Sequence, residues 1–248
     1  MPPQFRDTLS RKDEVLRIAI DGYITTVTPV SSAWIAKKSS LDLSSATIRN
    51  ILAELEEEGY LTHPHTSAGR IPTEDGYRYY VDHFMQEIKL LEAEKERIKA
   101  EYFRESFELE MLLETTSRVL ADTTQYTSIV SVDGGKKLFF SGTSFIVSYR
   151  DYQDMRKDIE KIKNILAALD EKEQLLEVIN RTLAKKINIL IGNETEFTAL
   201  SDCSLVVSRY ASKNGTSGRI AILGPTRMNY NKVVSTIEYL SDLVEGLI

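Results

Sequence analysis

Two adjacent side chains, Arg49 and Asn50, have the chemistry to read base edges in double-stranded DNA. An arginine can donate to O6 and N7 of guanine together, and an asparagine can bond to N6 and N7 of adenine. A solvated helix face capped by serine would have the same composition, so the pair indicates DNA binding only together with the elements that position it. Short hydroxyl side chains that could bond to phosphates or base edges come just before the pair, at Ser44, Ser45 and Thr47.

A second polar cluster follows in the segment 63–72, between two X-Pro sequences. Arg70, at the end of this cluster, could enter a narrow minor groove or contact a phosphate. The residues of this cluster that we expect to contact DNA are His65, Thr66, Ser67 and Arg70.

The elements that must hold these residues are predicted from apolar spacing and turn formers. Residues 44–58 have three apolar residues at helical spacing, a serine cap and a glycine stop. Segment 60–72 is then extended, because the residue before each proline avoids the helical region, and it has a polar turn at its centre. Helices over 10–27 and 31–38 precede these elements, and another begins after Thr73. This order is that of a winged helix-turn-helix domain, which we place at residues 1–85.

The stretch 44–81 also resembles a known family. Its motifs SSATIRN, LEEEGYL, PHTSAGRIPT and GYRYYVD are similar to the N-terminal signature of the HrcA-type heat-inducible transcription repressors. The resemblance implies a repressor that binds an inverted-repeat operator ahead of chaperone operons. It also implies that the activity of the repressor depends on the chaperonin.

The overall charge argues weakly against a nucleic-acid-binding protein. The 248 residues carry a formal net charge of −6, and residues 1–85 contain nine Lys or Arg against twelve Asp or Glu. Phosphate attraction requires local positive charge, so we expect modest non-specific affinity for a monomer and reliance on a dimer. A DNA surface must come from the placement of Lys37, Lys38, Arg49 and Arg70.

Cysteine content and hydropathy indicate the compartment. The single cysteine, Cys203, excludes an intramolecular disulfide and favours a reducing cytoplasm, and its apolar neighbours predict a buried, inert thiol. No stretch approaches the roughly 18 apolar residues of a membrane span, and no signal peptide precedes the polar start MPPQFRD. We therefore expect a cytoplasmic protein without a membrane partner.

The rest of the chain changes from helical to mixed patterning. Residues 86–121 lack proline and glycine and repeat apolar residues at heptad spacing, which predicts a connector helix that either packs on its own domain or forms a dimeric coiled coil. Lys95 and Glu105 interrupt the apolar seam, and the helix could break near Ser106. We expect an α+β protein with a second α+β domain at 122–248 that serves dimerisation or regulation. Its predicted strands are TSIVSV, KLFFSGTSFIV, INILIG, SLVVSRYA and GRIAILG, and its predicted helices span 152–169, 171–185 and 229–247.

The second domain resembles the GAF-like domain of the same family, through SRVLADTTQYTSIV, INILIGNETEF and ILGPTRMNY. Family members usually carry a long further segment, including an inserted dimerising domain, between the equivalents of Val130 and Leu138. Here Asp133, Gly134, Gly135 and Lys136 bridge that position directly. The chain therefore resembles a short form that lacks most of the inserted region.

We expect a sequence-specific repressor of chaperone operons that binds an inverted-repeat DNA operator as a homodimer. Two alternatives stay open: a regulator that senses a small molecule through its GAF-like domain, and an interaction protein without DNA binding. An enzyme is the least supported class, because His63, His65 and His83 all lie in the first half and leave the second without an imidazole base. The spacing of His63 and His65 suggests a metal site, but no cysteine and only the distant His83 could complete it, so we expect no metal and no cofactor.

Overall fold

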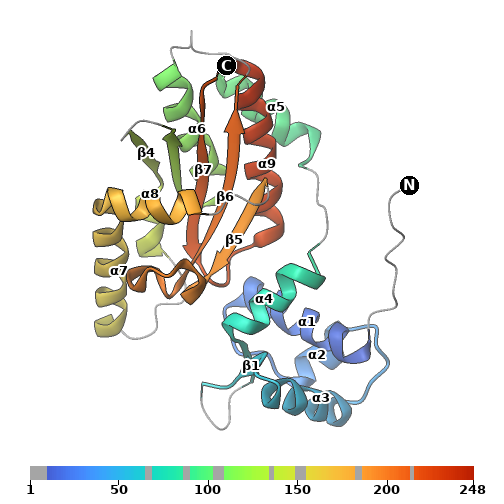
Figure 1. Ribbon diagram of the computed structural model, residues 1–248. Helices are drawn as coiled ribbons and strands as arrows, with labels where there is room; N and C mark the ends of the chain where they lie inside the picture. The colour runs from blue at the N-terminus through green and yellow to red at the C-terminus, as the bar shows by residue number, and fades with distance from the viewer. Residues whose placement is uncertain are drawn as a thin grey trace. The chain divides into compact units, whose positions relative to one another are not determined.

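The computed structural model describes residues 10–64, 69–85, 90–102, 109–133, 137–148, 155–181, 186–212 and 215–248. The chain divides into two compact units, Met1–Met85 and Gln86–Ile248, each with its own buried apolar residues (Figure 1). Within the described ranges, no helix is long and apolar enough to cross a lipid bilayer.

The first unit packs short helices around a small apolar core and adds an antiparallel ribbon. Its first helix begins at a capping box: Ser10 Oγ accepts from the Asp13 N–H at 3.1 Å, and Asp13 Oδ2 accepts from the Ser10 N–H at 3.2 Å. The elements predicted for this half are all present. They are α1 (Arg11–Thr26), α2 (Ser32–Lys38), α3 (Ser45–Glu57), β1 (Leu61–Thr62), β2 (Ile71–Pro72) and α4 (Glu74–His83).

The ribbon is short, but its backbone is also tied to the segment before α2. β1 and β2 pair antiparallel, with Leu61 opposite Pro72. Val30 and Arg70 exchange two backbone hydrogen bonds of 2.8 and 2.9 Å, which form an isolated antiparallel bridge. The predicted wing is therefore fixed to the helix-turn-helix through main-chain atoms.

The expected connector helix over 86–121 is two helices in the structure. α5 (Glu92–Tyr102) and α6 (Leu109–Thr124) both belong to the second unit, and α6 packs on the strands and on the last helix of that unit. Leu112 and Val119, two of the apolar residues at heptad spacing in α6, are buried there, whereas Leu109 is 37% exposed. Most of the heptad stripe of α6 thus packs inside its own domain.

The second unit is built on a five-stranded sheet in the order β4-β3-β7-β6-β5, with every neighbouring pair antiparallel (Figure 1). This arrangement confirms the predicted strand segments, with one change of length described below. The strands are β3 (Thr127–Val132), β4 (Leu138–Ser141), β5 (Ile187–Ile191), β6 (Cys203–Ala211) and β7 (Ser217–Pro225).

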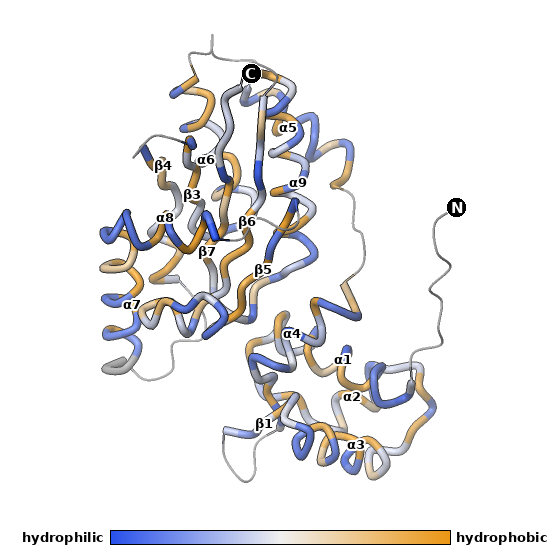
Figure 2. Tube along the Cα trace, viewed as in Figure 1, coloured by the Kyte–Doolittle hydropathy of each residue, from blue (hydrophilic) through white to orange (hydrophobic). Residues whose placement is uncertain are grey.

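Helices cover both faces of this sheet. α6 and α9 (Tyr230–Leu247) lie on one face, where Ser241 Oγ of α9 donates to Ser208 Oγ of β6 at 2.7 Å. α7 (Met155–Asp170), α8 (Lys172–Arg181) and the short 3-10 segments Thr143–Ser148 and Thr198–Leu200 cover the other face. A further 3-10 segment, Gly192–Thr195, follows β5. In Figure 2 the strands are largely apolar, whereas α7 and α8 alternate between polar and apolar residues. Cys203 belongs to the core of this second face and is 1% exposed, which confirms the predicted buried thiol.

One strand is shorter than predicted. The segment KLFFSGTSFIV has the composition of a single strand, but β4 ends at Ser141 and a 3-10 helix follows at Thr143–Ser148. Between them, Gly142 has a φ of +74°, and a Cβ on it would lie 2.8 Å from the Tyr126 carbonyl oxygen. This left-handed, crowded turn favours glycine and ends the strand.

Candidate nucleic-acid interface

The helix α3 is capped by its first polar residues. Ser44 Oγ accepts from the Thr47 N–H at 3.1 Å and lies 2.9 Å from Thr47 Oγ1. The sequence leaves the cap open between Ser44 and Ser45, and the structure assigns it to Ser44. The capped first turn places the positive end of the helix dipole where a phosphate would be favoured.

α3 has one buried face and one exposed face. Ile48, Leu52 and Leu55 are each at most 4% exposed and pack into the core. Within the described residues, the side chains of Arg49 and Asn50 have no hydrogen bond or ion pair, so both are available to a ligand. The predicted contact residues of this helix that are exposed to solvent are Ser44, Ser45, Thr47, Arg49 and Asn50.

α2 and the turn after it complete the helix-turn-helix. α2 sits close on α1, since a Cβ on Gly22 would lie 2.7 Å from the Trp34 ring. In the turn, Asp42 has a φ of +51°, a left-handed conformation that aspartate tolerates better than most residues. Lys37 and Lys38 are exposed at the end of α2, which contacts α3. The predicted placement of positive charge around the start of α3 is therefore partly supplied by α2.

The acidic residues of α3 lie in its second half, away from the capped first turn. Glu58 accepts a hydrogen bond from Lys12 of α1, and Lys12 Nζ also lies 4.0 Å from a Glu54 carboxylate oxygen. The hydrogen bond to Glu58 raises the pKa of the Lys12 ammonium group, which keeps it charged. Part of the negative charge of α3 is thus neutralised from within the unit.

The structure places Arg70 against α3. Arg70 Nη2 lies 2.7 Å from Glu56 Oε2, and His63 Nδ1 contacts the other carboxylate oxygen, Glu56 Oε1. The Arg70 side chain is only 22% exposed. The wing is therefore joined to α3 through Glu56. The other predicted wing contacts, His65, Thr66 and Ser67, lie outside the described residues.

Nothing in the sequence singles out Glu56. It is one of several acids at the end of α3, and nothing in the spacing of the chain separates it from the adjacent Glu57. Its role depends on the path of the ribbon, which brings positions 63 and 70 to the same turn of the helix. The contacts of Glu56 with these two positions can therefore be found only from the three-dimensional structure.

The tyrosines of α4 pack within the first unit. Tyr77 and Tyr80 are at most 4% exposed. The Tyr79 ring stacks on His83 at 4.1 Å between ring centroids, and its hydroxyl donates to Asp13 at 3.0 Å. Burial, together with that hydrogen bond, raises the pKa of Tyr79. These contacts support a packing role for the aromatic residues and not a platform for single-stranded nucleic acid.

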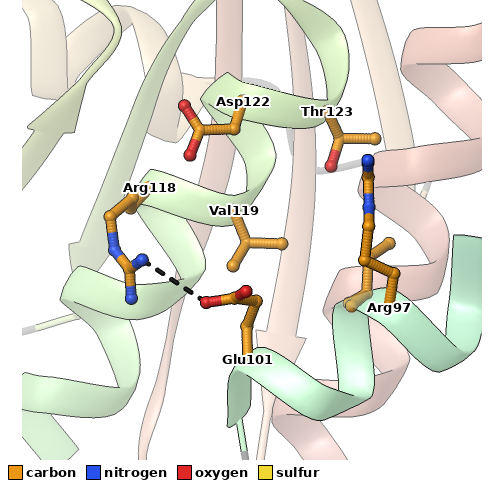
Figure 3. Close-up of a pocket in the computed structure, with 7 residues that line it drawn as sticks. Arg97, Glu101, Arg118, Val119, Asp122 and Thr123 are labelled. Carbon is orange, nitrogen blue, oxygen red and sulfur yellow. Dashed lines mark ion pairs between the residues drawn. The ribbon is translucent and has the colours of Figure 1, made fainter.

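The second unit contains a small polar cleft between α5 and α6 (Figure 3). The cleft has a volume of about 230 Å³, and Ile98 and Val119 contribute its apolar lining. Arg118 Nη1 lies 3.5 Å from Glu101 Oε2, so these two side chains form an ion pair. The cleft is lined by two positive and two negative side chains. The other polar lining residues are Arg97, Asp122 and Thr123.

The winged helix-turn-helix, followed by a helix-covered antiparallel sheet, defines the class of DNA-binding transcription regulators. A family profile described as HrcA protein C terminal domain matches residues 131–234. The heat-inducible transcription repressor HrcA of Carboxydothermus hydrogenoformans is 31% identical over 333 aligned positions, which cover 96% of this chain and 97% of that protein. The chain therefore belongs to the HrcA family of heat-inducible transcription repressors.

Further comparisons agree with this assignment. The HrcA repressor of Geobacter sulfurreducens is 27% identical and covers 98% of each chain. The fold is shared with a crystal structure of a hypothetical protein, at a TM-score of 0.73 and 18% identity, over 96% of this chain and 97% of that one. The predicted fold class, a winged helix-turn-helix with a GAF-like α+β domain, is confirmed.

The relatives are longer than this chain. The alignment with the Carboxydothermus hydrogenoformans protein extends over 333 positions, whereas the chain has 248 residues, so at least 85 aligned positions have no residue here. β3 ends at Val132 and β4 begins at Leu138, and the two strands pair directly. This hairpin lies where the family resemblance places the long inserted segment.

Gly69 provides a test of the contact between the wing and the helix-turn-helix. A Cβ at this position would lie 2.5 Å from the Val30 carbonyl oxygen, so Gly69→Val should break the bridge between Val30 and Arg70. We expect a loss of about 1–3 kcal/mol in the free energy of unfolding of the first unit, with a larger fractional loss of DNA affinity. Thermal unfolding and operator titration of the same variant measure both. If the free energy of operator binding falls only as much as the free energy of unfolding, Gly69 has a role in folding alone.

Proposed function

We propose that the protein represses chaperone operons by binding an inverted-repeat operator as a homodimer. The observation that carries this proposal is the exposed face of α3, which presents Arg49 and Asn50 from a capped helix in a helix-turn-helix. In this proposal α3 enters the major groove and the wing touches the flanking backbone or minor groove. Membership of the HrcA family supports the same role.

Each proposed contact residue has a distinct part in binding. Arg49 and Asn50 would bond to base edges, and the hydroxyl groups at the start of α3 would bond to phosphates or base edges. Lys37 and Lys38 would add attraction for the phosphate backbone. The contact residues that we propose are Ser44, Ser45, Thr47, Arg49 and Asn50 of α3 and His65, Thr66 and Ser67 of the wing. Arg70, which the sequence also predicts as a contact, is instead paired with Glu56.

The small number of exposed cations on one copy favours a dimer. Two copies related by a two-fold axis would match an inverted repeat whose half-sites are whole helical turns apart, and would double the phosphate contacts. The second unit would hold the two copies together. The dependence on a chaperonin that the family resemblance implies is part of the same proposal, as is the absence of enzymatic activity.

The charges around Arg49 favour this proposal over an interaction protein without DNA binding. Such a protein is expected to have a neutral or acidic surface at this position. Instead, Lys37 and Lys38 are exposed beside α3, and Asp42 is the acid of the intervening turn.

Arg49→Ala should weaken operator binding by about 1–3 kcal/mol and relax specificity at one position of each half-site, because a bidentate contact to guanine would be lost. Titrations against operators substituted at each base pair measure both effects. Arg11→Ala is a matched control, since Arg11 is an exposed cation at the start of α1. Unchanged specificity at every operator position would contradict the base contact.

A salt-series titration should show operator-selective binding by a dimer. The logarithm of the binding constant should fall linearly with the logarithm of salt concentration, because each phosphate contact releases counterions. Light scattering in the same buffers gives the mass of the protein, and a scrambled operator is the control. Weak binding by a monomer, equal on both DNAs, would show that this short chain does not build a repressor.

The cleft between α5 and α6 favours a second candidate function, the sensing of a small polar molecule by the second unit. Arg97 and Asp122 face the cleft with opposite charges, so we expect a zwitterion such as an α-amino acid to raise the melting temperature. Thermal unfolding with each L-amino acid at millimolar concentration is the measurement, and Arg97→Ala should abolish the shift. No shift with any amino acid would remove this candidate.

A further inference from the structure

Glu56 is placed where three segments of the first unit meet. It lies in the last turn of α3, and its two carboxylate oxygens contact different parts of the wing. His63 follows β1 and contacts Oε1, whereas Arg70 precedes β2 and pairs with Oε2 at 2.7 Å. One carboxylate therefore joins both sides of the ribbon to the proposed recognition helix.

Arg70 is held from a second direction by its backbone. Its N–H and C=O are paired with Val30, which lies two residues before α2. Arg70 Nε is buried and has no hydrogen-bond partner among the described residues, so the guanidinium group is turned inward. A side chain held in this way is poorly placed to serve as a free phosphate contact.

We propose that Glu56 is a positioning residue that sets the angle between the wing and α3, and that Arg70 acts through Glu56. This inference rests on the proposed function, in which α3 and the wing contact the operator together. The two elements must fit neighbouring grooves at the same time, so a fixed angle between them reduces the conformational entropy lost on binding. Glu56 stabilises that angle in the free protein, before DNA arrives.

If Glu56 is a positioning residue, removing its charge should change operator affinity in the direction opposite to the one that electrostatics alone predicts. Removal of a negative charge from a DNA-binding domain should strengthen binding, because phosphates repel acids. If Glu56 positions the wing, Glu56→Gln should instead weaken operator binding, by about tenfold. The matched control is Glu57→Gln, because Glu57 is an exposed acid on the same helix with no partner within the described residues. Glu57→Gln should leave affinity unchanged or raise it slightly.

A milder variant keeps the charge and changes only the reach of the side chain. Glu56→Asp shortens the side chain by one methylene, so it should also weaken binding if the contact with Arg70 matters. If charge alone matters, Glu56→Asp should bind like the unchanged protein. Circular dichroism and thermal unfolding of each variant show that the first unit is folded, and Glu56→Asp supplies the comparison where Glu56→Gln is unstable.

A double-mutant cycle and a salt series separate the two possible roles of Arg70. If it acts through Glu56, Arg70→Gln and Glu56→Gln should each lose about as much affinity as the double variant, since each removes the ion pair between Glu56 and Arg70. The slope of the logarithm of the binding constant against the logarithm of the salt concentration should then be the same for Arg70→Gln as for the unchanged protein. A direct phosphate contact would lower that slope by about one and make the two losses additive, which would overturn the proposal.

Arg49→Ala in the same assay separates this inference from the proposed function. Loss of binding in Arg49→Ala together with tighter binding in Glu56→Gln would overturn the positioning role alone. Binding of Arg49→Ala equal to that of the unchanged protein would overturn the assignment of α3 to DNA, and the role of Glu56 with it. Loss of operator binding in both Arg49→Ala and Glu56→Gln, with the binding of Glu57→Gln unchanged, supports both the proposed function and the positioning role of Glu56.

Discussion

Excess negative charge is the constraint that shapes the proposed DNA surface. Residues 1–85 contain more acids than bases, and every acid left unpaired near a phosphate backbone opposes binding. Two acids at the end of α3 form ion pairs within the unit: Glu58 pairs with Lys12, and Glu56 pairs with Arg70. Those cations are used to neutralise the unit, so attraction for DNA falls to cations that stay exposed on the helix-turn-helix. These are Lys37, Lys38 and Arg49.

The same helix serves the core and the surface, and the two roles depend on each other. Ile48, Leu52 and Leu55 fix the rotation of α3 about its axis, because their burial leaves one orientation in which the helix packs. That rotation exposes Arg49 and Asn50. Repacking of the core would therefore turn the proposed base contacts away from DNA without changing either of them.

Local patterns predicted most of the first unit, while contacts between distant segments escaped them. The serine cap, the apolar stripe of α3 and the ribbon after it depend on neighbours in sequence, and the structure confirms them and assigns the cap to Ser44. The contact of Glu56 with Arg70 depends on how the ribbon folds back, so the spacing held no signal for it. The heptad pattern over 86–121 was ambiguous for a related reason: an apolar stripe fits a sheet as well as a second helix, and α6 packs on the sheet.

β3 and β4 pair directly at the position where the family resemblance places a long inserted segment, so the sheet of the second unit is complete without such a segment. The strands pair over Ser128 to Ser131 with Leu138 to Ser141, and Phe140 packs against the same core as Ile129. A segment that leaves and returns at one turn adds mainly loop entropy, which grows slowly with length, so its loss need not disturb the sheet. In the proposed dimer, faces of the second unit would hold the two copies together, so the spacing between the two recognition helices would be set by the sheet domain.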